Sequence, residues 1–227
     1  MQRRGVRKQK TRNSTILVIA GICAVILVVV IFFASSNRRP IDSVASSAGK
    51  EWPEGKAASQ NENANFRNSS WGMSRDQVIA SEAGRSFENT NGILITSVDG
   101  VAGRFEASAL YYFDNVDCLY KAAYLMHLKH ANPNQFIDDF IELKDIYTEK
   151  YGAPTTDLEH WDDSFYKNDP SNYGMAIATG ALIYLCEWGS SNTVISLMLS
   201  GDNYECSVVI TYKDVDSNYE PPNQNGV

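Results

Sequence analysis

Beyond residue 39 the sequence is short of basic side chains. Residues 40–227 hold 12 lysines and arginines but all 27 aspartates and glutamates of the chain, which gives this part a net charge of −15. Binding to a nucleic-acid backbone requires basic side chains that displace counterions from the phosphates. The composition therefore excludes a nucleic acid as the partner of this part of the chain.

The sequence also lacks the short motifs that accompany common chemistries. It contains no Cys-x-x-Cys pair, so a structural zinc site is unsupported. Gly-x-Ser-x-Gly, the phosphate-binding loop and the dinucleotide fingerprint are absent as well. We therefore assign no catalytic residue, no metal ligand and no cofactor from the sequence.

Cysteine is scarce beyond the N-terminal region, where only Cys118, Cys186 and Cys206 occur. Three is an odd number, so one disulfide with one free thiol is one interpretation. The other, which we favour, is three thiols that pack as small apolar side chains. Their apolar strand contexts would raise the thiol pKa and make the thiols unreactive.

Histidine is rare too, with only His127, His130 and His160 in the chain. Together they form a conceivable metal set, but no single helix or strand aims the first two at one point, so we interpret all three as solvated polar residues. The acid-rich loop 162–169 offers the oxygen ligands that calcium prefers. Because it lacks the EF-hand spacing, we interpret it as a charged surface loop.

One long apolar segment is present near the N-terminus. From Ile16 to Ala34 the chain runs 19 positions without a charged or strongly polar side chain. As a helix this stretch is about 28 Å long, close to the ~30 Å hydrocarbon core of a bilayer. We predict a transmembrane helix over residues 15–34, with the lipid bilayer as its partner.

The basic residues around this segment predict its orientation. Residues 1–14 hold six bases and no acid, whereas only Arg38 and Arg39 follow the segment. Since bases stay on the cytoplasmic side, the N-terminus is expected in the cytoplasm and the remainder outside, as a single-pass membrane protein. A signal peptide cleaved near Ala34-Ser35-Ser36 is the alternative, although its apolar core would be shorter. Lipidation at Cys23 is disfavoured because the bulky Ile22 precedes it.

The remaining chain divides into a tether, a domain and a tail. Residues 35–65 have almost no apolar clustering and are predicted to be a flexible linker with a reach of about 30 Å. Residues 214–227, with Pro221-Pro222, are predicted to be disordered. An extracytoplasmic domain is therefore expected over residues 66–213.

Apolar spacing predicts an α+β fold for this domain. Ser74 and Gln77 form a capping box for a short helix to about Ala83, and Asn132-Pro133 opens a second helix that ends at Gly152. Strands are expected near 93–99, 102–113, 117–127, 175–188, 193–200 and 204–213, the last two with one packed and one wet face. We predict a curved, antiparallel, six-stranded sheet with two helices on one face. A diverged duplication is one interpretation of this order of elements.

The domain opens with Phe66-Arg67-x-x-x-Trp71-Gly72-x-Ser74, a run that resembles the start of a group of uncharacterised bacterial envelope domains. The later segments 150–154 and 200–203, with Trp161, are similar to that group as well. The resemblance implies an envelope location and no assigned activity. In architecture the group is similar to small modules of the outer-membrane-assembly lipoprotein type, which mediate protein contacts. A structural role for the motif is the simpler interpretation, with Trp71 as anchor, Gly72 as turn and Ser74 as cap.

Twelve tyrosines supply the remaining functional candidates. If Tyr112, Tyr184 and Tyr204 share an exposed sheet face, they would form a sugar- or protein-binding surface, although tyrosine also simply suits strands. The leading hypothesis is a membrane-tethered, non-catalytic module that binds an envelope protein or a cell-wall component. The alternatives are a cell-envelope hydrolase, with a carboxylate or His160 in its site, and a purely structural membrane protein.

Overall fold

The computed structural model describes residues 64–217, which form an α+β domain. The predicted transmembrane helix at 15–34 lies outside the described residues, as do nearly all of the tether and residues 218–227 of the tail. Within residues 64–217, no helix has the length and apolar character needed to cross a membrane.

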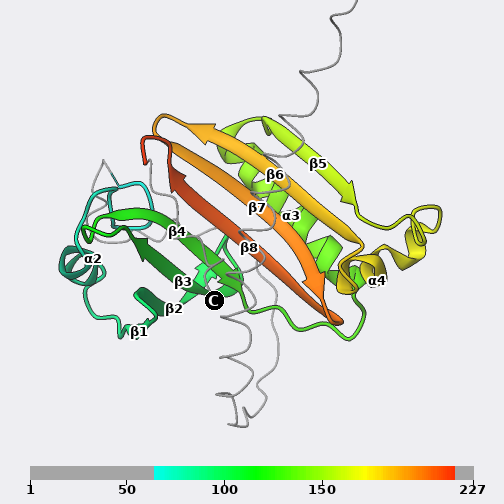
Figure 1. The fold of residues 1–227 in the computed structure, drawn as a ribbon, viewed down its shortest axis with the longest axis horizontal. Coiled ribbons are helices and arrows are strands. Elements are labelled where there is room, and N and C mark those ends of the chain that lie inside the picture. The colour runs from blue at the N-terminus through cyan, green and yellow to red at the C-terminus, as the bar shows by residue number, and fades with distance from the viewer. Residues whose placement is uncertain (1–63, 218–227) are drawn as a thin grey trace, which may run out of the picture. The chain divides into compact units, whose positions relative to one another are not determined.

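Eight strands form one antiparallel sheet, accompanied in the described residues by three α-helices and one 3-10 turn (Figure 1). The helices are α2 (Arg75–Ser81), α3 (Asn134–Tyr151) and α4 (Tyr173–Ala178), and the 3-10 turn η1 is Pro170–Asn172. The strands are β1 (Glu88–Thr90), β2 (Ile93–Val101), β3 (Phe105–Phe113), β4 (Leu119–Met126), β5 (Thr156–Trp161), β6 (Leu182–Ser190), β7 (Thr193–Asp202) and β8 (Glu205–Asp214). The class and the antiparallel sheet are as predicted.

The two halves of the domain repeat one order of elements. Helix α2 precedes the meander β1–β4, and α3 precedes β5–β8, with η1 and α4 inserted after β5. The strand order β1-β2-β3-β4-β8-β7-β6-β5 brings the last strands of the two halves together in the middle of the sheet. This arrangement is the one that a duplication of a helix and four strands would produce.

The predicted number of six strands is wrong, because β1 and β5 were not expected. Strand β1 is polar and only three residues long. Strand β5 contains a single leucine, Leu158, which lies between two acidic residues. The strand expected at 175–188 is also partly wrong, since its first residues form α4 and the strand begins at Leu182. A short apolar run such as Met175–Ala178 fits a helix as well as a strand, and periodicity alone does not separate them.

The predicted helix ends are largely confirmed. Ser74 accepts from the Gln77 backbone amide, and the Gln77 side chain accepts from the Ser74 amide, which completes the capping box. Helix α3 ends at Gly152, whose φ of 83° suits a residue without a Cβ. The predicted start is one residue off, because α3 begins at Asn134 with Pro133 rather than Asn132 as N-cap, although Asn132 Oδ1 accepts from the backbone amide of Asn134.

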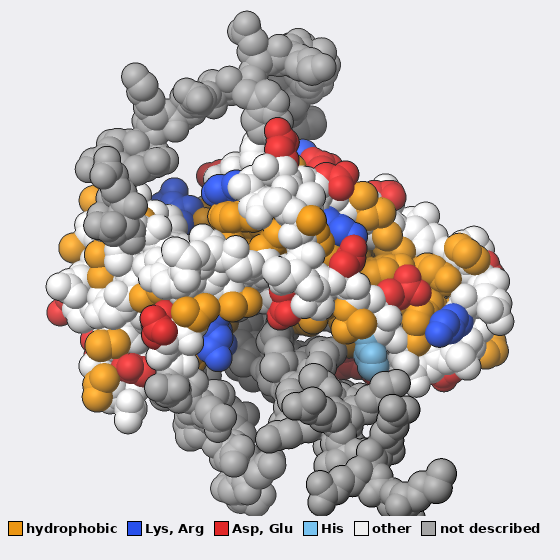
Figure 2. All heavy atoms as spheres, turned by 90° about the horizontal axis from the view of Figure 1, so that it is seen from above, with side chains coloured by type: hydrophobic (Ala, Val, Ile, Leu, Met, Phe, Trp, Pro, Cys, Tyr) orange, Lys and Arg blue, Asp and Glu red, His pale blue; other side chains and the backbone are white. Residues whose placement is uncertain are grey.

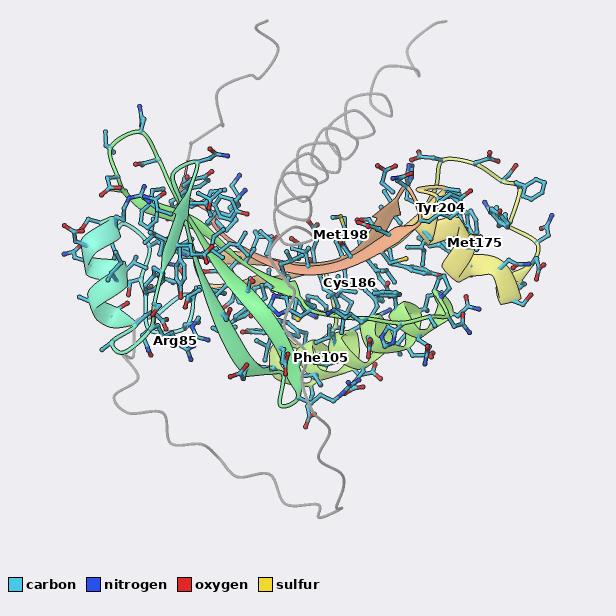
Figure 3. The ribbon with its side chains drawn as sticks, turned by 90° about the horizontal axis from the view of Figure 1, so that it is seen from below. Arg85, Phe105, Met175, Cys186, Met198 and Tyr204 are labelled. Atoms are coloured by element: carbon cyan, nitrogen blue, oxygen red, sulfur yellow. The ribbon has the colours of Figure 1, made fainter. Side chains whose placement is uncertain are left out.

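The helices lie on one face of the sheet. Helices α3 and α4 pack on β6–β8, and the core there includes Trp188, Leu197 and Ile210. Figure 3 shows Cys186 pointing from the sheet towards α3 and Met198 pointing to the opposite side. All three cysteines of the domain are free thiols, as we favoured, and burial raises the pKa of Cys186 to about 12 and of Cys206 to about 11.

The opposite face of the sheet carries a second set of buried apolar side chains. Register places Leu110, Leu125, Val209, Met198 and Leu185 on this face, and each is at most 9% exposed. The prediction that β7 and β8 have one packed and one wet face is therefore wrong. Their serines and threonines suggested a wet surface, but apolar residues lie between them on the same face.

Candidate functional site

The three candidate tyrosines do not form one surface. Tyr112 is 9% exposed on the face opposite the helices. The amine nitrogen of Lys121 lies over its ring, 4.0 Å from the ring centroid. Tyr184 lies on the helix face and stacks on Phe140 at a centroid distance of 5.6 Å. Tyr204, 72% exposed, lies in the β7–β8 turn. The assumption that they share an exposed sheet face is therefore wrong.

The opening motif fastens the start of the domain to the sheet. Phe66 is 2% exposed and packs its ring against Tyr111, Tyr124 and Tyr212 of three strands. The indole nitrogen of Trp71 donates to Thr193 Oγ1 at 3.0 Å, and the amide of Gly72 donates to the carbonyl of Leu119 at 2.8 Å. These contacts are structural, as the simpler interpretation of the motif predicted.

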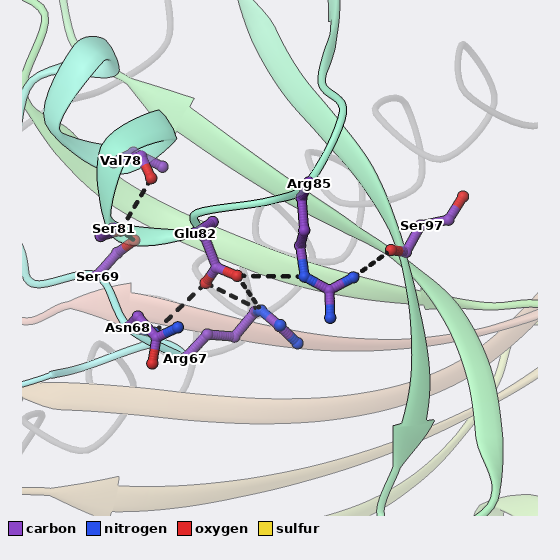
Figure 4. A network of polar contacts seen from close by, with 8 residues as sticks. All are labelled: Arg67, Asn68, Ser69, Val78, Ser81, Glu82, Arg85 and Ser97. Atoms are coloured by element: carbon purple, nitrogen blue, oxygen red, sulfur yellow. Dashed lines mark hydrogen bonds and ion pairs between the residues drawn. The ribbon is translucent and has the colours of Figure 1, made fainter. Parts of the chain in front are cut away.

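A buried ion pair holds the same segment to the end of α2 (Figure 4). Both carboxylate oxygens of Glu82 accept from Arg67 Nε, at 3.0 and 3.1 Å, and Arg85 Nε lies 3.5 Å from Oε2. The Glu82 side chain is 1% exposed, whereas Arg67 is 17% and Arg85 35% exposed. Arg67 thus neutralises a carboxylate that has almost no contact with water.

A cleft of about 520 Å³ opens beside this fastened segment. We call it the polar cleft. Its walls come from the first described residues, the end of α3, the β6–β7 turn and the strands next to that turn: Ala64, Asn65, Tyr151, Ser190, Ser191, Asn192, Thr193, Ile195 and Tyr212. None of these nine side chains carries a charge at neutral pH. The volume lies within the range of small-molecule sites.

Hydrogen bonds across the polar cleft fix its two sides. Asn65 Nδ2 donates to Asn192 Oδ1 at 2.9 Å, and Asn65 Oδ1 accepts from the Trp71 amide. The hydroxyl of Thr193 donates to Asn192 Oδ1 at 3.2 Å. Asn192 Nδ2 and the hydroxyl of Tyr151 have no hydrogen-bond partner among residues 64–217.

The three histidines lie apart, and each has its own polar neighbour. His127 Nε2 lies 2.9 Å from Ser108 Oγ, His130 Nε2 2.5 Å from Asp139 Oδ2, and His160 Nε2 2.9 Å from Asp162 Oδ1. No group of three or more His, Cys, Asp or Glu residues in the described part is arranged to hold a metal ion. The acid-rich loop 162–169 likewise holds no such group.

Asp139 of α3 is a buried acid. It is only 5% exposed, although acidic side chains usually lie on the solvent side of a helix. Its second carboxylate oxygen accepts from Arg104 Nη2 at 2.9 Å, and Arg104 also bonds Glu142. The hydrogen bonds with Arg104 and His130 compensate for the loss of water around this carboxylate.

No family model, curated protein or solved structure matches this chain. The candidate site is therefore argued from its own geometry. Sequence reasoning missed the polar cleft, because Asn65 lay in the predicted tether and Asn192 in a predicted turn. These two residues are 127 positions apart, and no local pattern indicates their contact.

A pair of lysines on the face opposite the helices gives a test of the electrostatics. Lys121 of β4 and Lys213 of β8 are register partners, and neither forms an ion pair with a carboxylate in the described part. Burial, together with the smaller effect of the charge of Lys213, lowers the pKa of Lys121 to about 8. The cation–π contact with the Tyr112 ring offsets part of the free-energy cost of burying the Lys121 charge.

Replacing Lys121 with methionine is expected to stabilise the domain by about 1–2 kcal/mol at pH 7. The pKa of Lys121 is lower in the folded than in the unfolded state, so its charged form destabilises the fold at neutral pH. This destabilisation fades as the pH rises from about 8 to above 10.4, and the advantage of Lys121→Met should fade with it. Thermal unfolding from pH 7 to 10.5 tests this, with the exposed Lys167→Met as control; equal effects of both variants at pH 7 would refute it.

Proposed function

We propose that the protein is a membrane-tethered binding module on the outer side of a bacterial membrane, where it contacts an envelope protein or a cell-wall component. The observation that carries the proposal is the polar cleft, which has the volume of a ligand site and lies where the chain enters the domain. Residues 64 and 65 line the cleft, so a tether that ends at residue 65 would hold the cleft at its own end.

The fastened entry segment supports this arrangement. A flexible tether moves a domain freely, but a binding site needs walls held in a fixed geometry. Phe66, Trp71 and the Arg67–Glu82 pair hold the entry segment against the sheet, so Asn65 keeps its place in the cleft wall. The apolar segment 16–34 and the six bases before it support the membrane tether and its orientation.

A hydrolase is the second candidate, and one pair of side chains favours it. Ser108 Oγ lies 2.9 Å from His127 Nε2, within the range of a nucleophile and its base. Burial lowers the pKa of His127, which favours the neutral form of the imidazole. The side chain of Ser108 is however 0% exposed, which gives a substrate no access in this conformation.

Site-specific cross-linking in intact cells separates these candidates. A photo-reactive amino acid at Ser191, an exposed residue of the polar cleft, is expected to capture an envelope protein or a wall fragment. The same group at Asn89, on the distant edge strand β1, should not. Protease added to intact spheroplasts should digest the domain, with no need to lyse the membrane first. The proposal fails if Ser191 captures nothing beyond the Asn89 control. Reaction of the purified full-length chain with a fluorophosphonate at Ser108 would then favour the hydrolase.

A further inference from the structure

The polar cleft stands out from the charge of the domain around it. Between residues 64 and 217 there are ten basic and 22 acidic side chains, a net charge of −12. Acidic side chains are scattered over the face drawn in Figure 2. The nine residues that line the cleft nevertheless include no acid and no base. Lys150 packs over the ring of Tyr151 at 5.0 Å but does not line the cleft.

This lining is suited to a ligand without charge. An anion, such as a phosphate-bearing polymer, needs basic side chains to replace its water, and the lining offers none. A cation would need a carboxylate, which the lining lacks as well. The surrounding negative charge repels anions further. The ligand is therefore neutral and polar.

The groups in the cleft both donate and accept hydrogen bonds. Within residues 64–217 no group pairs with the two amide hydrogens of Asn192 or with the hydroxyl of Tyr151, and Ser190 and Ser191 lie exposed at the rim. Sugar hydroxyls and acetamido groups donate and accept in the same way. The apolar faces of sugar rings pack on aromatic side chains, and the partly exposed Tyr151 supplies one at the cleft, whereas Tyr212 is only 8% exposed. We infer that the polar cleft binds a neutral glycan; this rests on the proposed binding function.

An extended peptide fits the cleft less well. Peptides that bind sheets do so by pairing with the free backbone of an edge strand. The strand that contributes most to the cleft, β7, is paired with β6 from Thr193 to Leu199 and with β8 from Thr193 to Asp202. No unpaired edge is left there for a peptide backbone, so side chains must supply the recognition.

The test is calorimetric titration of the full-length chain in detergent with a tetramer of N-acetylglucosamine. Micromolar to millimolar binding is expected, and the uronic acid tetramer of polygalacturonate should not bind. Asn192→Ala should weaken binding about tenfold or more, because the amide hydrogens are lost. Ser190→Trp should abolish it by filling the cleft from an exposed position that does not affect folding. Asn89→Ala, outside the cleft, is the matched control.

Each outcome decides between distinct conclusions. Loss of binding in both cleft variants, with an unchanged unfolding temperature in Ser190→Trp, supports the glycan site. Equal binding of the anionic tetramer, or undiminished binding by Ser190→Trp, overturns it. If the N-acetylglucosamine tetramer does not bind while Ser191 captures a protein in cells, the ligand class is wrong and the proposed function stands. If Ser191 captures nothing as well, both are wrong.

Discussion

Replacing Gly201 with alanine is expected to destabilise the domain by about 3 kcal/mol or more. A Cβ on this residue of β7 would overlap the carbonyl oxygen of Ile177 and lie 2.8 Å from that of Glu205. Both atoms belong to the backbone, so neither can move aside as a flexible side chain would. The close approach exists because α4 docks on the β7–β8 turn, where Tyr204 donates to the carbonyl of Ala178 at 2.9 Å.

Gly189→Ala is the matched control for this prediction. Gly189 lies in the neighbouring strand β6, has no atom within 4 Å of its hypothetical Cβ, and has no positive φ. For a domain of this size, 3 kcal/mol corresponds to a fall of about 6–12 °C in the unfolding temperature. Tryptophan fluorescence of the full-length chain in mild detergent measures it. Comparable melting of the two glycine variants would show that α4 is not fixed against the hairpin as described.

The same close approach shows why part of the fold could not be predicted. Alternating residues in β3, β7 and β8 and the caps of α2 and α3 are local signals, and these elements were predicted near their observed bounds. Helix α4 has no such signal: its residues YGMAIA have no cap and contain a glycine. Contact with the glycine of β7 allows this segment to pack as a helix. Such a contact depends on tertiary structure, which overrides local propensity.

The second buried face was missed for a related reason. Ser196 and Thr211 lie on that face beside Met198 and Val209, and a mixed pattern of this kind reads as a wet surface. The predicted number of strands was wrong because β1 and β5, which were missed, are the two edge strands of the sheet. Edge strands are half-paired, so their sequences need less apolar character than central strands.

The candidate site was predictable only in part. The sequence indicated that Trp71 is an anchor, and the structure gives it a partner in Thr193, which also lines the polar cleft. The tyrosines were chosen by residue type, without knowledge of register, and Tyr112 and Tyr184 fall on opposite faces. Tyr151 and Tyr212, which do meet in the cleft, come from α3 and β8, two elements whose contact has no sequence signal.

Replacing Arg67 with methionine is expected to destabilise the domain by about 3–5 kcal/mol. The change leaves the carboxylate of Glu82 buried at 1% exposure, with only Arg85 at 3.5 Å and the Asn68 amide at 3.4 Å as partners. Backbone strain does not account for the loss, since Arg67 has a φ of 56° and methionine in that conformation costs about as much as arginine. The wall of the polar cleft should also be displaced, because Asn65, which lines it, lies two residues before Arg67.

Two further variants separate charge from packing. Arg85→Met removes the more exposed partner and leaves the two bonds from Arg67, so a loss of about 1 kcal/mol or less is expected. The double variant Arg67→Met/Glu82→Gln removes the buried charge as well and should recover more than half of the loss, as a double-mutant cycle would measure. If the double variant is no more stable than Arg67→Met alone, the guanidinium acts through packing, and Glu82 is not the charge that the opening motif exists to neutralise.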